Sequence, residues 1–288
     1  IRVTSRFQQM PSAGNPADRE FPMSERNFSE LKKIAYEVTG INLSDHKQNM
    51  IYGRLARRVR ALGLRDFDQY CALLVQDSSP EIREFVNAIT TNQTAFFREN
   101  HHFDYVKNTL LPDLLRRKQS ERRIRIWSAG CSTGEEPYSL AMVVRSIPAL
   151  NTWDVKILAT DLDSNVLAKA EAGEYAAERF ASVPPQYHPH VEREQERNVI
   201  IMRDELRRLV TFKQLNLLHS WPMKGLFDII FCRNVVIYFD VPTQVKLFDR
   251  YATMLAPEGH LFIGHSESLH KISQRFVSLG RTIYQRTQ

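Results

Sequence analysis

Two neighbouring acids open a predicted helix directly after a loop of small residues, and this combination suits a cationic small molecule. The loop runs from Gly130 to Gly134 with the sequence GCSTG, and Glu135 and Glu136 follow it. The two glycines allow the backbone to turn sharply and to approach a ligand without a clash from Cβ. A tight strand-to-helix turn that binds nothing is the alternative explanation of the same residues.

The glycine spacing argues against two common nucleotide sites. The loop reads G-x-x-x-G, whereas a dinucleotide site requires G-x-G-x-x-G and a phosphate-binding loop ends in Gly-Lys-Ser/Thr. Glu135 and Glu136 would also repel a pyrophosphate placed at this helix start. A ligand without phosphate and with a cationic group fits better. S-adenosylmethionine has this character, because it joins an adenosine to a sulfonium and an ammonium group.

A third acid, Asp161, ends the next predicted strand. In an open α/β sheet, a carboxylate at the carboxyl end of a strand can accept hydrogen bonds from the hydroxyls of a ribose. Asp163 follows two residues later, and an acid at this place can instead cap the next helix. We predict that Asp161 binds ribose and that Asp163 or Ser164 is the helix cap.

The elements that must position these residues alternate between strand and helix after residue 120. Predicted strands cover 123–128, 155–160, 227–232 and 259–264, with helices from Glu135 to about Arg145 and from about Ser164. Such alternation predicts an α/β fold with a mostly parallel, Rossmann-like sheet. Residues 173–213 break the rhythm. We expect 199–202 and 209–212 to form an antiparallel pair there, within a small β insertion.

The first hundred residues predict a helical domain over 24–90, followed by the α/β domain over 91–288. Runs with helical apolar spacing follow candidate N-caps at Ser24, Ser44, Asp66 and Ser79. Residues 1–23 are polar and rich in Pro, Ser, Asn and charge, which is typical of a disordered tail.

Composition limits the class of protein. The chain has 288 residues, 43% hydrophobic, and a net charge of +6, which suits an acidic partner. No apolar run approaches the roughly 20 residues of a membrane helix, and the N-terminal residues show no apolar signal-peptide core. We therefore expect a cytoplasmic protein. Its three cysteines lack metal-ligand spacing, so we expect no metal site.

Separated motifs in this chain resemble the CheR family of chemotaxis receptor methyltransferases, from about residue 24 to the C-terminus. The motifs are residues 92–99 (NQTAFFRE), 134–139 (GEEPYS), 231–239 (FCRNVVIYF) and 264–267 (GHSE). The resemblance implies a class I methyltransferase domain that uses S-adenosylmethionine, with a helical N-terminal domain and a small antiparallel β insertion. It also implies the reaction, which forms methyl esters on glutamates of receptor signalling helices and releases S-adenosylhomocysteine.

The resemblance further implies which residues bind the cofactor. Asn92, Thr94 and Arg98 would approach it from the segment between the domains, and Ala129 and Gly130 belong to the loop that follows the first strand. Glu136 would hold the methionine moiety and Asp161 the ribose. The remaining expected contacts flank the adenine or follow the 227–232 strand: Asn216, Leu217, Arg233 and Asn234.

Two of the implied residues are candidates for the chemistry itself. Methyl transfer to a carboxylate needs no strong base, because a glutamate with a pKa of about 4.3 is already ionised at neutral pH. Arg98 could orient a carboxylate of the cofactor or of the acceptor, or it could be a surface arginine paired with Glu99 or Asp104. Tyr238 could attract the sulfonium with its ring, or it could be a core tyrosine.

A basic helix face predicts where the substrate docks. Arg54, Arg57 and Arg58 fall within an arc of roughly 100° on a helix. A solvated helix face is the alternative, and the family resemblance favours docking of an acidic receptor helix. Some family members also bind a pentapeptide at the receptor C-terminus through a glycine-containing turn in the insertion. Residues 190–198 contain no glycine, so we expect a tether-independent member that does not bind such a peptide.

Two other functions compete with this interpretation. A nucleic-acid methyltransferase that modifies amino groups would carry Asp/Asn-Pro-Pro-aromatic after the 227–232 strand, and this chain has residues 233–236 (RNVV) there. We therefore expect no nucleic-acid partner. A catalytically inactive receptor-docking module would have no reason to retain the complete set of expected cofactor residues.

Overall fold

The computed structural model describes residues 19–287, and the chain divides into two compact units. One unit contains the described residues up to Val38 together with Asn42–Ile89. The other contains Thr39–Ile41 and the described residues from Thr90 onward. The segment Thr39–Ile41 thus belongs to the second unit, although the chain on both sides of it belongs to the first.

The first unit is built from helices that begin close to the predicted N-caps. They are α1 (Glu25–Thr39), η2 (Asp45–Lys47), α2 (Gln48–Ala61), α3 (Phe67–Leu74) and α4 (Glu81–Ile89). Ser24 Oγ accepts from Asn27 N at 3.1 Å, and Asp66 Oδ1 accepts from Gln69 N at 2.9 Å. Ser44 makes no side-chain cap bond, and the 3₁₀ turn η2 precedes α2. The second helix therefore starts three residues later than predicted.

The segment expected to be a tail is described only from Arg19, and residues 1–18 lie outside the described residues. Arg19 Nη2 donates to Asn49 Oδ1 at 2.6 Å, Phe21 N donates to Tyr52 Oη at 3.2 Å, and Glu20 pairs with Arg60. Residues 19–21 are therefore tied to α2.

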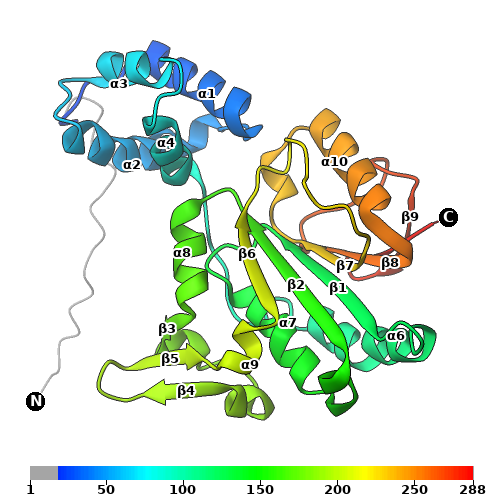
Figure 1. The fold of residues 1–288 in the computed structure, drawn as a ribbon. Helices are drawn as coiled ribbons and strands as arrows, with labels where there is room; N and C mark the ends of the chain where they lie inside the picture. The colour runs from blue at the N-terminus through cyan, green and yellow to red at the C-terminus, as the bar shows by residue number, and fades with distance from the viewer. Residues whose placement is uncertain (1–18, 288) are drawn as a thin grey trace, which may run out of the picture. The chain divides into compact units, whose positions relative to one another are not determined.

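The second unit is organised by a seven-stranded sheet in the order β6-β2-β1-β7-β8-β10-β9 (Figure 1). Its first five strands are mutually parallel, and β10 and β9 complete the sheet in antiparallel fashion. This is the class I methyltransferase fold that the resemblance implies. The strands are β1 (Arg123–Ala129), β2 (Asp154–Asp161), β6 (Val210–Gln214), β7 (Phe227–Cys232), β8 (Leu255–Ile263), β9 (Phe276–Gly280) and β10 (Ile283–Arg286).

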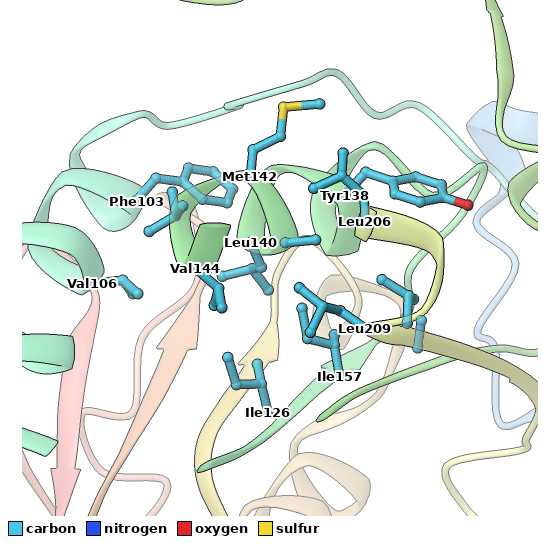
Figure 2. Packing of buried hydrophobic residues seen from close by; sticks show 14 of the residues in the cluster. Phe103, Val106, Ile126, Tyr138, Leu140, Met142, Val144, Ile157, Leu206 and Leu209 are labelled. Atoms are coloured by element: carbon cyan, nitrogen blue, oxygen red, sulfur yellow. The ribbon is translucent and has the colours of Figure 1, made fainter. Parts of the chain in front are cut away.

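Helix α7 (Glu135–Arg145) is buried on all sides because it lies between the sheet and other elements of the unit. Figure 2 shows Leu140 and Val144, one turn apart on this helix, close to Ile126 of β1 and Ile157 of β2. The same cluster includes Phe103. The other longer elements here are α5 (His101–Tyr105), η3 (Val106–Leu110), α6 (Leu111–Arg117), α8 (Ser164–Ala172) and α10 (Val241–Met254).

The small β insertion is a three-stranded antiparallel sheet in the order β3-β5-β4. It contains β3 (Glu174–Ala176), β4 (Val191–Glu194) and β5 (Val199–Met202). The predicted pairing of 199–202 with 209–212 is wrong. Residues of β6 instead pair in parallel with β2, from Val210 opposite Ile157 to Gln214 opposite Asp161. The insertion therefore ends before β6, which is an edge strand of the main sheet.

Among residues 19–287, no helix combines the length and the apolarity that a bilayer crossing requires.

Candidate active site

The glycine loop after β1 adopts a backbone that only glycine tolerates at both ends. Gly130 has a φ of +92° and Gly134 a φ of +95°. A Cβ at position 130 would lie 2.3 Å from Val235 Cγ2, and one at position 134 would lie 2.8 Å from Tyr175 Oη. Gly130 N also donates to Thr160 O at 2.8 Å, which ties the loop to β2. The two predicted glycines are therefore required by sterics.

A pocket opens beyond the carboxyl ends of the neighbouring strands β6, β2, β1 and β7. It is lined by residues that follow each of these strands and by residues 90–95. All but one of the residues predicted to bind the cofactor or to take part in the chemistry line it: Asn92, Thr94, Arg98, Gly130, Glu136, Asp161, Asn216, Leu217, Arg233, Asn234 and Tyr238. Ala129 is the exception, because it is fully buried in the core with Trp127.

Some of the pocket wall could not be foreseen from sequence. Thr39 and Ile41 line the pocket, although they lie inside the predicted helical domain. Gly40 between them has a φ of +73°, and a Cβ there would lie 2.0 Å from Leu218 Cδ1. The glycine signals the end of a helix in the sequence, but nothing in the sequence identifies Leu218 as its neighbour.

Asp161 projects into the pocket from the end of β2 with both carboxylate oxygens partly used. Ser132 N donates to Oδ2 at 2.8 Å, and Asp163 N donates to Oδ1 at 3.0 Å. The carboxylate as a whole retains acceptor capacity that a ribose hydroxyl can use. Burial raises the pKa of Asp161 to about 6, against the lowering effect of these backbone donors.

Asp163 has the capping role that was one of the two predicted alternatives. Its Oδ1 accepts from Asn165 N at 2.8 Å and caps α8. Its Oδ2 accepts from Thr90 Oγ1 at 2.8 Å and from Asn92 Nδ2 at 2.7 Å. The side chain of Asn92 is thereby fixed against α8 and lines the pocket from there.

Glu136 is a buried acid whose charge is opposed by Arg233. Its Oε1 accepts from Ser128 Oγ at 2.8 Å, and its Oε2 lies 3.2 Å from Arg233 Nη1. Burial raises the pKa of Glu136, although Arg233 and Ser128 act in the opposite direction. Glu136 thus lies in the pocket wall as an acceptor that a cationic group can approach.

Arg233 forms ion pairs with two acids, Glu136 and Glu99. Besides Glu136, its guanidinium lies 3.5 Å from Glu99 Oε2 and donates to the carbonyl oxygen of Arg98. Burial favours a higher pKa for Glu99, but Arg233 and His265 outweigh it and hold that pKa below its ordinary value. Glu99 was a predicted partner of Arg98, and its carboxylate instead faces Arg233 and His265.

The segment from Asn92 to Arg98 is anchored by two buried rings. Phe96 packs edge-on against Tyr175, and Phe97 stacks on Tyr187 with ring centroids 4.6 Å apart. Between these anchors and the pocket, Arg98 is partly exposed and donates from Nη1 to Gln93 O at 2.9 Å. Arg98 also lines the pocket wall.

One group of side chains near the pocket offers ligand atoms for a metal. Atoms of Glu99, His101 and His102 lie within 4.8 Å of one another. The Arg233 guanidinium is 3.5 Å from Glu99 Oε2, so a divalent cation there would meet a fixed positive charge. Burial lowers the pKa of His102 to about 4, which keeps its ring neutral.

The three docking candidates have different surroundings in α2. Arg57 is exposed, whereas Arg54 Nη1 donates to Ala88 O at 3.1 Å. Arg58 makes two bonds to the buried Glu81, at 2.8 and 2.7 Å. Arg58 therefore holds α2 against α4 within the helical unit, and Arg57 is the exposed member of the set.

Comparison with known protein families identifies both parts of the chain. The description "CheR methyltransferase, all-alpha domain" matches residues 26–90, and "CheR methyltransferase, SAM binding domain" matches residues 92–285. The chain belongs to the CheR methyltransferase family. Its second unit is the domain that binds S-adenosylmethionine. The pocket beyond the carboxyl ends of β1 and β2 lies in this unit.

Relatives match this CheR chain over nearly its whole length. A probable chemotaxis protein methyltransferase of Rhizobium etli is 45% identical, covering 88% of this chain and 97% of the relative. Chemotaxis protein methyltransferase 2 of Pseudomonas aeruginosa is 44% identical, covering 95% and 96%. The chemotaxis protein methyltransferase of Escherichia coli is 42% identical, covering 91% of each chain.

Proposed function

We propose that this CheR methyltransferase moves the methyl group of S-adenosylmethionine to glutamate side chains on cytoplasmic signalling helices of chemotaxis receptors. The names of the relatives support a chemotaxis protein as the acceptor. The finer assignment, a glutamate γ-methyl ester, rests on the chemistry of the pocket. The protein would accordingly work in the cytoplasm, where these helices lie.

The ester assignment is supported mainly by which titratable side chains line the pocket. Among the described residues that line it, none is a histidine, lysine or cysteine. The acids in the wall are Glu136 and Asp161, and both already accept hydrogen bonds from protein donors. A lysine acceptor, with a pKa of about 10.4, would need a base to remove its proton. A glutamate acceptor needs none.

The proposed reaction is balanced without a proton transfer. The bound cofactor supplies a methyl group on a positively charged sulfur. An oxygen lone pair of the acceptor carboxylate forms the new O–CH₃ bond as the S–CH₃ bond breaks, and that electron pair stays on sulfur. The products are a neutral ester and neutral S-adenosylhomocysteine. Holding the two reactants in line can lower the barrier by roughly 7–11 kcal/mol.

We assign the pocket residues to parts of the cofactor by the chemistry of their free groups. The remaining acceptor capacity of Asp161 suits the ribose hydroxyls, and Glu136 suits the cationic methionine end. Asn216 and Leu217, which follow β6, would flank the adenine. Gly130 fits the same scheme, because its missing side chain leaves the backbone open to the ligand.

Arg98 and Tyr238 are the residues that we place at the reacting groups. The partly exposed fork of Arg98 would orient a carboxylate, of the cofactor or of the acceptor, through paired hydrogen bonds. The ring of Tyr238 would face the sulfonium and favour its positive charge. Both side chains line the pocket, which supports these roles.

The helical unit is the proposed docking surface for an acidic receptor helix. In this proposal Arg57 makes the direct contact. Arg54 and Arg58 contribute long-range charge, because their donors are partly used within the unit. In the insertion, residues 195–198 join β4 to β5, and Arg197 pairs with Glu174 and Glu194. We propose that this turn binds no receptor pentapeptide, and low-micromolar binding in calorimetry would contradict this.

The direct test is incubation with labelled S-adenosylmethionine and bacterial membranes that contain chemotaxis receptors, followed by mild alkali. A carboxyl methyl ester releases volatile methanol, whereas an N-methyl group retains the label. Label retained after alkali, or label in nucleic acid, would overturn the proposal. Binding of S-adenosylhomocysteine without any transfer would indicate an inactive docking module.

A pair of glycine variants controls for the pocket. Gly130→Ala should abolish both cofactor binding and methanol release, because its Cβ would meet Val235 at 2.3 Å and its φ is +92°. Gly225→Ala makes the same chemical change where nothing lies within 4 Å, so it should leave both unchanged.

A further inference from the structure

The loop that follows β7 is held by a buried carboxylate from the loop that follows β8. Glu267 is 6% exposed. Its Oε2 accepts from Asn234 N at 3.0 Å and from Gly264 N at 2.5 Å, and its Oε1 accepts from Val236 N at 3.0 Å. One side chain thus binds three backbone amides and fixes two loops together at the carboxyl edge of the sheet.

The carbonyl groups of the same loop are held from the opposite direction. Gln244 of α10 donates from Nε2 to Val236 O and to Phe239 O, both at 3.0 Å. Two side chains therefore bind the loop from Asn234 to Phe239, one through its N–H groups and one through its C=O groups. Both belong to elements outside that loop.

The backbone of residues 234–239 passes close to the loop that follows β8, and this contact limits the conformations that it can adopt. Asn234 has a φ of +57°, in the left-handed region. A Cβ on Gly264 would lie 2.4 Å from Asn234 Nδ2, so the two loops touch where Glu267 joins them. A conformation of this kind persists when surrounding groups hold it in place.

The loop carries residues that line the pocket, and its backbone is bound from both sides. Asn234 and Tyr238 both line the pocket, one at each end of the bound turn. We propose that Glu267 and Gln244 are positioning residues for methyl transfer: by binding the backbone of residues 234–239 they place Asn234 and Tyr238 against the reacting groups. This proposal rests on methyl transfer as the reaction, but not on which group accepts the methyl.

The geometry requires a carboxylate at position 267. An ionised glutamate only accepts hydrogen bonds, whereas a glutamine offers one oxygen acceptor and an NH₂ donor. In Glu267→Gln the NH₂ group would face at least one of the amides of Asn234, Val236 and Gly264. That amide would lose its partner while the volume of the side chain stays the same.

Asp228 provides a matched control at the other end of β7. It is 4% exposed, and its carboxylate accepts from Arg125 N and Lys118 Nζ, each at 2.8 Å. It does not line the pocket. Asp228→Asn and Glu267→Gln therefore remove the same charge from the same domain and lower its stability together, while only the second frees the loop.

The experiment measures total labelled methyl transfer at saturating cofactor, together with the Kd of S-adenosylhomocysteine and the melting temperature. Glu267→Gln should lower kcat about tenfold or more while the Kd stays within about threefold, because a misplaced group costs mainly the transition state. Gln244→Glu should lower kcat in the same direction. Glu267→Asp, which keeps the acceptors, should recover part of the rate. Asp228→Asn should retain kcat.

Hydrogen exchange of the amides of Asn234, Val236 and Gly264 provides a readout that does not depend on the acceptor. Exchange should rise in Glu267→Gln and not in Asp228→Asn. Unchanged exchange, or an equal loss of kcat in both variants, would overturn the proposal. If the loop loosens as expected but the label survives mild alkali, the ester assignment fails and the positioning role stands.

Discussion

Arg233 Nη1 lies 3.2 Å from Glu136 Oε2, and the two side chains are only 2% and 11% exposed. Removal of one partner from a buried ion pair commonly leaves the other as an uncompensated charge, at a cost of roughly 3–5 kcal/mol. Arg233 keeps a second acid, Glu99, at 3.5 Å. Substitution of Glu136 therefore leaves Arg233 paired with Glu99, whereas substitution of Arg233 would deprive both acids of this guanidinium. The role of Glu136 in binding can be tested for this reason.

The first prediction concerns Glu136→Gln. The affinity for S-adenosylhomocysteine should fall by roughly ten- to hundredfold, because a hydrogen bond to a charged group is worth about 1.5–3 kcal/mol. Folding should be largely retained, since Arg233 still faces Glu99. Calorimetric titration measures the affinity. The neighbouring acid Glu135 pairs with Arg179 and does not line the pocket, so Glu135→Gln is the control. Equal weakening by both substitutions would rule out a specific contact.

The second prediction is a pH dependence of cofactor binding that Asp161 controls. Its pKa is about 6 in the folded protein, raised from 3.8, so protonation below pH 6 removes part of its acceptor capacity. The affinity for S-adenosylhomocysteine should be constant above about pH 7 and should fall below pH 6, by at most about tenfold per pH unit. Asp161→Asn should bind weakly and lose this dependence. Calorimetric titrations of both proteins with S-adenosylhomocysteine between pH 5 and 8 measure this dependence.

The same group should affect stability with the opposite sign. Because the pKa of Asp161 is raised on folding, the folded protein holds this proton more tightly than the unfolded chain. The contribution of Asp161 to stability therefore grows as the pH falls from about 6 to about 4. Denaturation of the ligand-free protein and of Asp161→Asn over this range should differ in slope. Parallel curves would show that Asp161 titrates normally.

The third prediction is that Arg98→Ala damages turnover more than folding. The side chain of Arg98 donates to Gln93 O and is partly exposed, so the stability should change by less than about 1 kcal/mol. We expect kcat/KM to fall by roughly tenfold to a hundredfold, because the paired donors that orient a carboxylate are lost. Arg98→Lys should recover only part of the lost kcat/KM. Arg116→Ala, at an exposed arginine paired with Asp113, is the control. Unchanged kinetics in Arg98→Ala would refute the role.

The fourth prediction separates the ring of Tyr238 from its hydroxyl group. An aromatic ring near a cation contributes about 0.5–2 kcal/mol, and only S-adenosylmethionine carries the sulfonium charge. Tyr238→Ala should therefore weaken S-adenosylmethionine several-fold more than it weakens S-adenosylhomocysteine, whereas Tyr238→Phe should weaken both alike. Calorimetry with the two ligands measures this difference. If Tyr238→Ala lowers both affinities equally, the ring does not recognise the charge.

Local patterns in the sequence were sufficient for the parts of the fold that short-range physics determines. The alternating strands, the glycine loop at 130–134 and the caps at Ser24, Asp66 and Asp163 all follow from backbone sterics and local hydrogen bonds. The predicted site residues gather in one pocket because parallel strands place their carboxyl ends on the same edge. The motifs are far apart in sequence, and the topology brings them together.

The features that could not be predicted from the sequence depend on contacts between residues that are far apart in the chain. The β6 segment has the apolar content of any short strand, and only its register with β2 excludes the expected pairing with β5. Glu267 lies 33 residues from Asn234, and a lone acid shows no sign of the amides that it binds. Arg58 has the same residue type and helix face as Arg57, and only Glu81, 23 residues away, separates their roles.

The surroundings of Arg58 decide how the docking surface can be tested. Reversing its charge would set a new acid against the buried Glu81, so a loss of activity would report misfolding of the helical unit. Arg57 is exposed on the same helix and can be reversed without this conflict. Arg83 of α4 is 67% exposed in the same unit, so Arg83→Glu gives an equal change of net charge at a different place.

We predict that Arg57→Glu lowers kcat/KM for receptor methylation about tenfold or more at low salt, because a favourable contact with an acidic helix becomes a repulsion. The difference from the parent protein should shrink as salt screens the charges. The Kd of S-adenosylhomocysteine and the melting temperature should stay unchanged, since Arg57 does not line the pocket. Arg83→Glu should have a much smaller effect. If the two reversals slow methylation equally, the receptor responds to the net charge of the unit, and α2 is not the docking surface.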